Sequence, residues 1–89
     1  MKKRMVVVTT SHRGVFYGEF EKQEAKVVTL KEARNCIYWS SDVNGFVGLA
    51  ANGPTDDCRI GPAAPKMELQ DVTAVLDCTE KAVKAWKKA

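Results

Sequence analysis

The stretch 38–64 constrains this chain more than any other part of the sequence, because glycine and proline interrupt it repeatedly. It holds four of the six glycines and two of the three prolines, which excludes a long helix. Its apolar side chains nevertheless need burial, and these are Val43, Phe46, Val47, Leu49 and Ile60. A long irregular segment in a small domain is usually functional or disordered. Its apolar content favours an ordered loop that forms a recognition surface.

The length predicts a single domain, 1–89, with a small hydrophobic core. Hydrophobic residues at 45% and charged residues at 28% argue against intrinsic disorder. Domains of this size often gain stability by association. We therefore expect a homo-oligomer.

The formal net charge is +3, and its distribution says more than its sum. Half of the 14 basic residues gather at the two ends of the chain, as Lys2, Lys3, Arg4, Lys81, Lys84, Lys87 and Lys88. In contrast, the loop 39–65 holds Asp42, Asp56 and Asp57 against Arg59 alone. A nucleic-acid binder concentrates positive charge where the phosphate backbone lies. This distribution disfavours nucleic acid as the partner.

Cysteine spacing and hydropathy indicate the compartment. Cys36, Cys58 and Cys78 form no CxxC pair, and with His12 they lack the spacing of a zinc site. The apolar residues after Met1 are too few for a signal peptide, and no run reaches membrane-spanning length. We expect a cytoplasmic protein with reduced thiols, no membrane partner, no metal and no cofactor.

The apolar pattern predicts a series of strands and one helix. Strands are expected at 5–10, 15–20, 26–30, 33–39 and 67–76, with shorter ones at 46–49 and 58–60. A bend or bulge is expected at Gly18, a hairpin tip at 21–25, and the link 31–33 joins two neighbouring strands. In the strand 33–39, Cys36 and Tyr38 should share one face.

A helix is expected at 81–88, begun by a capping-box variant that runs from Asp77 to Glu80. Ala82, Val83 and Trp86 form its apolar face. A helix this short is marginal in water, so Trp86 must dock on the sheet or on another subunit.

These elements predict a mostly β fold with one helix. We expect a small SH3-like or Sm-like antiparallel barrel or meander, with an irregular Gly/Pro-rich loop and a C-terminal α-helix. The turn at Arg13 and Gly14 and the bent strand at Gly18 resemble the opening of Sm-like and SH3-like barrels over about the first forty residues.

The loop offers the residue types of a ligand site. Tyr38 or Trp39 could stack on a planar ligand, a contact of about 1–3 kcal/mol for a base, although Trp39 could equally be a core residue. Arg59 suits a phosphate group or could pair with a neighbouring aspartate. The candidate ligand-binding residues are Tyr38, Trp39, Ser40, Ser41, Asn44, Thr55 and Arg59. The sequence contains no recognised nucleophile, P-loop or paired-carboxylate motif, so an enzyme is not expected.

The segments Tyr38-Trp-Ser-Ser, Gly48-Leu-Ala, Gly53-Pro-Thr and Cys58-Arg-Ile-Gly-Pro resemble a family of small phage and prophage proteins. In size and in the absence of catalytic motifs the chain is also similar to oligomeric phage sponges, which sequester nucleotide signals of bacterial immune systems such as CBASS and Thoeris. The resemblance implies a non-enzymatic protein that sequesters a nucleotide-derived second messenger in an infected bacterium. Two alternatives remain: an Sm-like nucleic-acid binder that uses His12, Arg13 and the terminal lysines, and an interaction module that inhibits a host protein.

Overall fold

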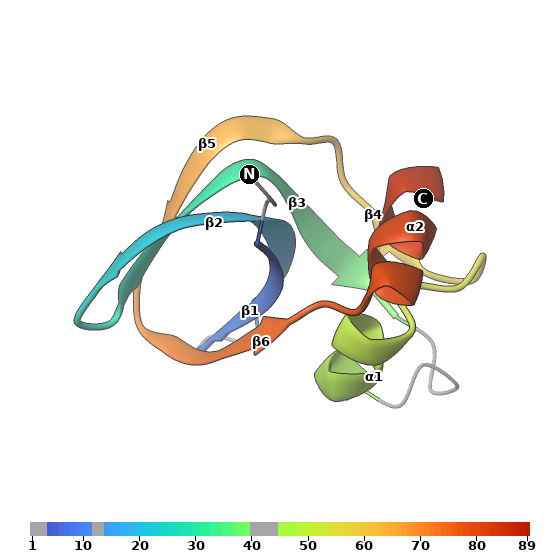
Figure 1. The fold of residues 1–89 in the computed structure, drawn as a ribbon, viewed down its shortest axis with the longest axis horizontal. Coiled ribbons are helices and arrows are strands. Elements are labelled where there is room, and N and C mark those ends of the chain that lie inside the picture. Colours follow the sequence, from blue (N-terminus) through green and yellow to red (C-terminus); the bar gives the residue numbers. More distant parts are fainter. Residues whose placement is uncertain (1–3, 12–13, 40–44) are drawn as a thin grey trace.

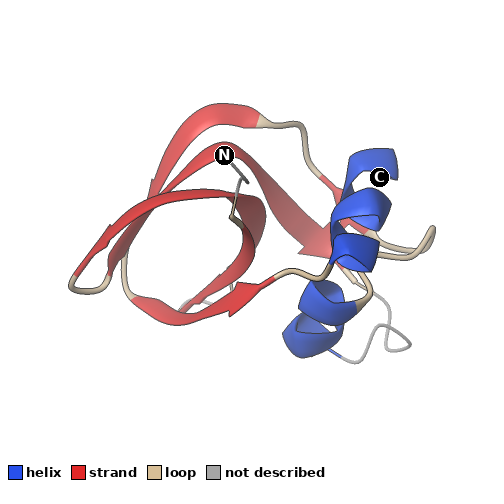
Figure 2. Cartoon of the chain, viewed as in Figure 1, coloured by secondary structure: helices blue, strands red, loops and turns tan. Residues whose placement is uncertain are grey.

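The computed structural model describes residues 4–11, 14–39 and 45–89. Six antiparallel strands form one sheet, and two short helices accompany it. The elements are β1 (Met5–Thr10), β2 (Val15–Glu24), β3 (Val27–Tyr38), α1 (Gly45–Ala51), β4 (Arg59–Ile60), β5 (Ala64–Leu69), β6 (Val72–Asp77) and α2 (Glu80–Lys88). The mostly β class and the C-terminal helix are therefore as predicted (Figure 2).

The sheet is strongly curled but open. Its order is β4-β3-β2-β1-β6, and β5 pairs with β3 further along the edge that β4 also occupies. Since only Gln70 and Asp71 separate β5 from β6, the chain brings the two edges of the sheet toward each other, and the strands follow a ring-like path (Figure 1). No pairing joins β5 to β6 among the described residues. The prediction of a closed barrel is not confirmed.

The curl gives the sheet two buried faces. Val6 and Val8 pack inside it with Val28, Leu30 and Leu69. Strand residues alternate between faces, so the intervening Val7 lies on the other side, in a cluster that includes residues of both helices. The helices α1 and α2 lie together beside the ring of strands (Figure 1). Burial of β1 on both sides explains why its sequence is apolar without alternation.

The strand β3 is continuous where a link between two strands was predicted at 31–33, and a bulge opposite Gly18 accommodates its bend. The β2–β3 register shifts between Tyr17 and Glu19, as expected for Gly18, and a Cβ there would lie 3.0 Å from the Lys31 carbonyl oxygen. The prediction of separate strands at 26–30 and 33–39 was wrong. Glu32, at φ 51°, absorbs the extra residue opposite Gly18, so β3 bends without turning. The β2 strand also runs past its predicted end to Glu24.

The Gly/Pro-rich loop is more regular than its composition suggests. The segment predicted as a strand at 46–49 is helical instead: α1 buries the consecutive residues Gly48, Leu49 and Ala50, whereas a strand would direct alternate side chains to opposite faces. The short strand at 58–60 is confirmed as β4. The single strand predicted at 67–76 is divided into β5 and β6, since Asp71 adopts φ 54° at the turn between them.

Helix α2 begins at a different cap from the one predicted. Thr79 is the N-cap, and its hydroxyl oxygen accepts a hydrogen bond from the Ala82 amide at 3.1 Å. Asp77 instead ends β6 and pairs with Arg4 at 2.7 Å. Trp86 is fully buried against the sheet and α1, which confirms that it must dock. Neither α1 nor α2 is long and apolar enough to cross a membrane, and the same holds for any helix in the described ranges.

Candidate functional site

Two of the predicted ligand residues lie opposite each other at the end of the sheet. Tyr38 is the last residue of β3 and pairs with Arg59 of β4. Side chains of directly opposed residues in an antiparallel pair extend to the same face. Tyr38 is 53% exposed, and Arg59 is also exposed. The two strands thus place an aromatic ring and a guanidinium group side by side on the surface.

The exposure of Tyr38 departs from the predicted alternation. Cys36 is buried, whereas both Ile37 and Tyr38 are exposed. The β3–β4 register shifts between Cys36 and Tyr38, and this irregularity rotates Tyr38 away from the face that Cys36 occupies. The prediction that Cys36 and Tyr38 share a face was wrong for this reason.

Arg59 has no carboxylate partner in the part of the chain that the structure describes. The alternative that it pairs with Asp56 or Asp57 is therefore not supported. Asp42, the third carboxylate considered, lies outside the described residues, as do Ser40, Ser41 and Asn44.

Trp39 and Thr55 have different surroundings from Tyr38 and Arg59. Trp39 is half-buried and packs against the cluster on the helix side of the sheet, as its interpretation as a core residue requires. Thr55 begins the turn before β4, where its carbonyl oxygen accepts from the Cys58 amide at 3.1 Å. Thr55 also lines a small cavity of about 360 Å³ that reaches the end of α2. The structure therefore brings Tyr38 and Arg59 together and places Thr55 at a neighbouring hollow.

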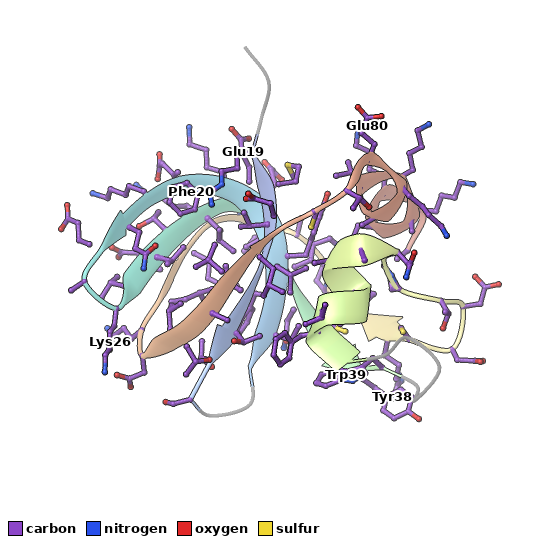
Figure 3. All side chains as sticks on the ribbon, turned by 60° about the horizontal axis from the view of Figure 1, so that its bottom comes forward. Glu19, Phe20, Lys26, Tyr38, Trp39 and Glu80 are labelled. Atoms are coloured by element: carbon purple, nitrogen blue, oxygen red, sulfur yellow. The ribbon has the colours of Figure 1, made fainter. Side chains whose placement is uncertain are left out.

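A larger cavity of about 700 Å³ lies between the sheet and α2. Its residues come from β1, β2, β3, α2 and the segments that precede β5 and α2; they are Met5, Tyr17, Glu19, Glu32, Arg34, Ala63, Cys78, Glu80, Val83, Lys84, Trp86 and Lys87. Figure 3 shows Glu19 and Glu80 at one end of the molecule and Tyr38 and Trp39 at the opposite end. The cavity and the Tyr38–Arg59 pair are therefore separate places on the protein.

Aromatic stacking and hydrogen bonds to backbone carbonyl oxygens stabilise the wall of this cavity. The rings of Tyr17 and Trp86 stack with centroids 4.5 Å apart and planes 5° from parallel. The Trp86 indole nitrogen donates to the Leu49 carbonyl at 3.1 Å. Arg34 donates from Nε to the Gly61 carbonyl and from Nη1 to the Trp86 carbonyl, both at 2.9 Å. The wall therefore links β2, β3, α1 and α2.

Two groups in the cavity wall keep their protons at neutral pH. Burial raises the pKa of the Tyr17 hydroxyl to about 12, although the Arg34 charge lowers it in part. Burial, together with the charge of Asp77, raises the pKa of the Cys78 thiol to about 12. Because the thiolate is the reactive form, Cys78 serves as an apolar wall. Burial also raises the pKa of Cys36 to about 11.

The remaining chemistry of the described residues is limited. Cys36, Cys58 and Cys78 are all free thiols. No group of three histidine, cysteine or carboxylate side chains is placed to hold a metal ion within 4–11, 14–39 and 45–89.

The sequence analysis did not identify the cavity. Its residues are distant in sequence, and each has an ordinary structural interpretation: Tyr17 as a strand residue, Arg34 as an exposed charge, and Lys84 and Lys87 as the solvated face of a helix. The one sequence signal for the cavity was Tyr17, a tyrosine within a predicted strand. A tyrosine hydroxyl that becomes buried needs a hydrogen-bond partner, so its position deserved a search for one. Only the packing of α2 shows where that hydroxyl lies.

Together these features define a small, open-sheet, mostly β domain with an exposed aromatic–arginine pair and a separate cavity beneath its C-terminal helix. The chain belongs to the DUF6948 family, a domain of unknown function whose family model matches residues 3–86. No curated protein and no solved structure matches the chain.

Proposed function

We propose that this protein is a non-enzymatic binding protein that sequesters a nucleotide-derived second messenger of bacterial immunity. The proposal rests on one observation, the placement of Tyr38 opposite Arg59 with both side chains exposed. An aromatic ring lies beside a guanidinium group that has no carboxylate partner among the described residues. These two groups match the base and the phosphate of a nucleotide. The sequence contains no recognised catalytic motif, so the proposal includes no reaction.

In this proposal Tyr38 stacks on the base. Stacking of a base on an aromatic ring contributes about 1–3 kcal/mol and depends little on which base is bound. Arg59 donates two parallel hydrogen bonds to phosphate oxygens. Other predicted residues hydrogen-bond the polar edges of the ligand or close the site around it in this proposal: Trp39, Ser40, Ser41, Asn44 and Thr55. The cytoplasm of an infected bacterium is the compartment that such a function requires.

Exposed apolar side chains support a second part of the proposal, the homo-oligomer. Ile37 is 61% exposed, Phe46 39% and Val47 59%. Residues of this kind are depleted from surfaces that remain in water. The same observation favours the alternative function, an interaction module that binds a host protein through exposed apolar side chains. Light scattering that shows a 9.8 kDa monomer at tens of micromolar would remove the homo-oligomer.

The test is native mass spectrometry of the full chain with cyclic nucleotides and ADP-ribose derivatives, followed by calorimetry of any ligand that binds. Loss of the Arg59 charge should weaken binding roughly a hundredfold in Arg59→Ala, with the melting temperature unchanged. The matched control is Lys26→Ala, because Lys26 lies at the far hairpin (Figure 3) and should leave affinity unchanged.

Two results would contradict the proposal. If no compound in the panel binds the wild-type protein, the interaction-module alternative takes its place. If a ligand binds Arg59→Ala and wild type equally, Arg59 does not contact phosphate. A nucleic-acid binder would instead show steep loss of affinity with salt.

A further inference from the structure

The hydroxyl of Tyr17 is a buried polar group in the cavity wall. Tyr17 is 4% exposed, and its hydroxyl oxygen is buried with no hydrogen-bond partner among the described residues. A buried hydroxyl left without a partner carries a free-energy cost. Tyr17 also lines the cavity of about 700 Å³, so a molecule bound there could provide the missing partner.

Arg34 brings a positive charge to the same cavity. The charge acts on the Tyr17 hydroxyl, since it is one of the causes that set the pKa of Tyr17. The hydrogen bonds of Arg34 go to the neutral carbonyls of Gly61 and Trp86, and in the described ranges it has no ion pair with a carboxylate. Its Nη2 donors are not used in either bond. A partly buried guanidinium without a counter-ion is unusual, and it favours an anionic group nearby.

The other charges around the cavity balance one another. Glu19, Glu32 and Glu80 contribute three negative charges. Lys84 and Lys87, with Arg34, contribute three positive charges. Both lysines, Glu32 and Glu80 are exposed, so solvent screens them more than it screens Arg34. Glu19 is half-buried like Arg34 and also lies at this cavity, and Arg34 is the cation whose charge acts on the Tyr17 hydroxyl.

The rest of the wall is apolar. Met5, Val83 and Trp86 line the cavity, and Cys78 adds a thiol that remains protonated. Ligand sites of about 300–1,000 Å³ typically combine an apolar lining with a few polar groups that fix orientation. This cavity has that composition, with two hydrogen-bond donors from β2 and β3.

We propose that the cavity between the sheet and α2 binds a small carboxylic acid with an apolar body. The carboxylate accepts hydrogen bonds from the Tyr17 hydroxyl and from Nη2 of Arg34, and the apolar body lies along Met5, Val83 and Trp86. This site shares no residue with the Tyr38–Arg59 pair, so either proposal can fail without the other. Tyr17 acts here as a neutral donor, because its hydroxyl stays protonated at neutral pH.

The test uses benzoate as the probe and NMR of the isotope-labelled full-length protein as the readout. Benzoate should cause saturable shifts of the Trp86 indole N–H and of the Arg34 Nε–H, because both residues line the cavity. Benzyl alcohol, which has a similar apolar body and no carboxylate, should bind at least about tenfold more weakly, as expected when a hydrogen bond to a charged group is lost.

Tyr17→Phe is the decisive variant. It removes the hydroxyl and keeps the ring that stacks on Trp86, so the protein should remain folded with equal or higher stability. Its affinity for benzoate should fall roughly ten- to a hundredfold. Ser11→Ala is the control, because it removes an exposed hydroxyl that lines neither the cavity nor the Tyr38–Arg59 pair, and it should bind benzoate as wild type does.

Three results would overturn the proposal. The first is the absence of saturable shifts at Trp86 and Arg34 with benzoate. The second is equal affinity for benzoate and benzyl alcohol. The third is equal benzoate affinity of Tyr17→Phe and wild type, which would show that the hydroxyl makes no contact with the carboxylate.

Discussion

Replacement of Trp86 by alanine should be one of the most destabilising single changes in this chain. The side chain is fully buried, stacks on Tyr17 and donates to the Leu49 carbonyl at 3.1 Å. Loss of a buried tryptophan side chain costs about 3–5 kcal/mol. The Leu49 carbonyl, left without its donor, adds to this cost. We therefore expect a decrease of about 4–5 kcal/mol in the free energy of unfolding of Trp86→Ala.

This value is a large part of the total stability. A domain of this length is typically stable by roughly 4–13 kcal/mol. The nine-residue helix α2 is marginal without tertiary contacts, so the variant should also lose helical signal in circular dichroism. Urea unfolding at two protein concentrations measures the change, and the midpoint should fall by roughly 2–4 M, given the usual dependence on urea.

Two further variants test whether the loss of stability is specific to the docking of the Trp86 side chain. Trp86→Phe keeps an aromatic ring beside Tyr17 and loses the indole N–H, so it should cost about 2 kcal/mol. Trp39→Ala removes the other tryptophan, which is only half-buried, and should cost about 1–2 kcal/mol. If Trp86→Ala changed stability by no more than Trp39→Ala, the docking of α2 through Trp86 would be refuted.

Three other predictions follow from local geometry. Gly53→Ala should lower stability by about 2–3 kcal/mol more than Gly45→Ala, as measured by thermal melts of the two variants. Both glycines have positive φ, so both substitutions introduce the same backbone strain. A Cβ at Gly53 would in addition lie 2.5 Å from the Ala85 Cβ, whereas Gly45 faces open space. Thr79→Ala should cost about 1–2 kcal/mol through loss of the N-cap of α2, measured by urea unfolding, and Thr79→Ser should restore most of it. Burial raises the pKa of the Cys36 thiol to about 11 from its ordinary value of 9.0, so stability should be full below pH 9 and fall as pH rises to about 11, by roughly 2–3 kcal/mol from this thiol. Cys36→Ala should flatten part of that fall, and an identical pH profile for the variant would contradict the assignment.

The local elements were predictable where short-range patterns decide them. The run Met5–Thr10 was predicted with its observed bounds, because it is rich in β-branched residues, which favour a strand. The bulge at Gly18 followed from the glycine itself. Segment 46–49 was mistaken for a strand, since a short apolar run does not distinguish a strand from a buried helix, and α1 is helical where Leu49 packs in the core.

The candidate sites were predictable only in part. Tyr38 and Arg59 were recognised by residue type, and their pairing came from the register of β3 with β4. The cavity was not recognised, because Tyr17, Arg34 and Trp86 are brought together by hydrogen bonds and stacking across about seventy positions of sequence. No local pattern encodes such a contact.

The sequence by itself determined that this chain is mostly β, with a short amphipathic helix at its C-terminal end. Alternation, β-branched runs and glycine positions act over a few residues, so they can be read along the chain. The tertiary structure alone decided that the sheet stays open, that β3 is continuous through Glu32, and that α2 covers a cavity beside Tyr17. These features depend on which distant segments pack together, and packing across the fold determines whether a given polar group is paired, exposed or left to face a ligand.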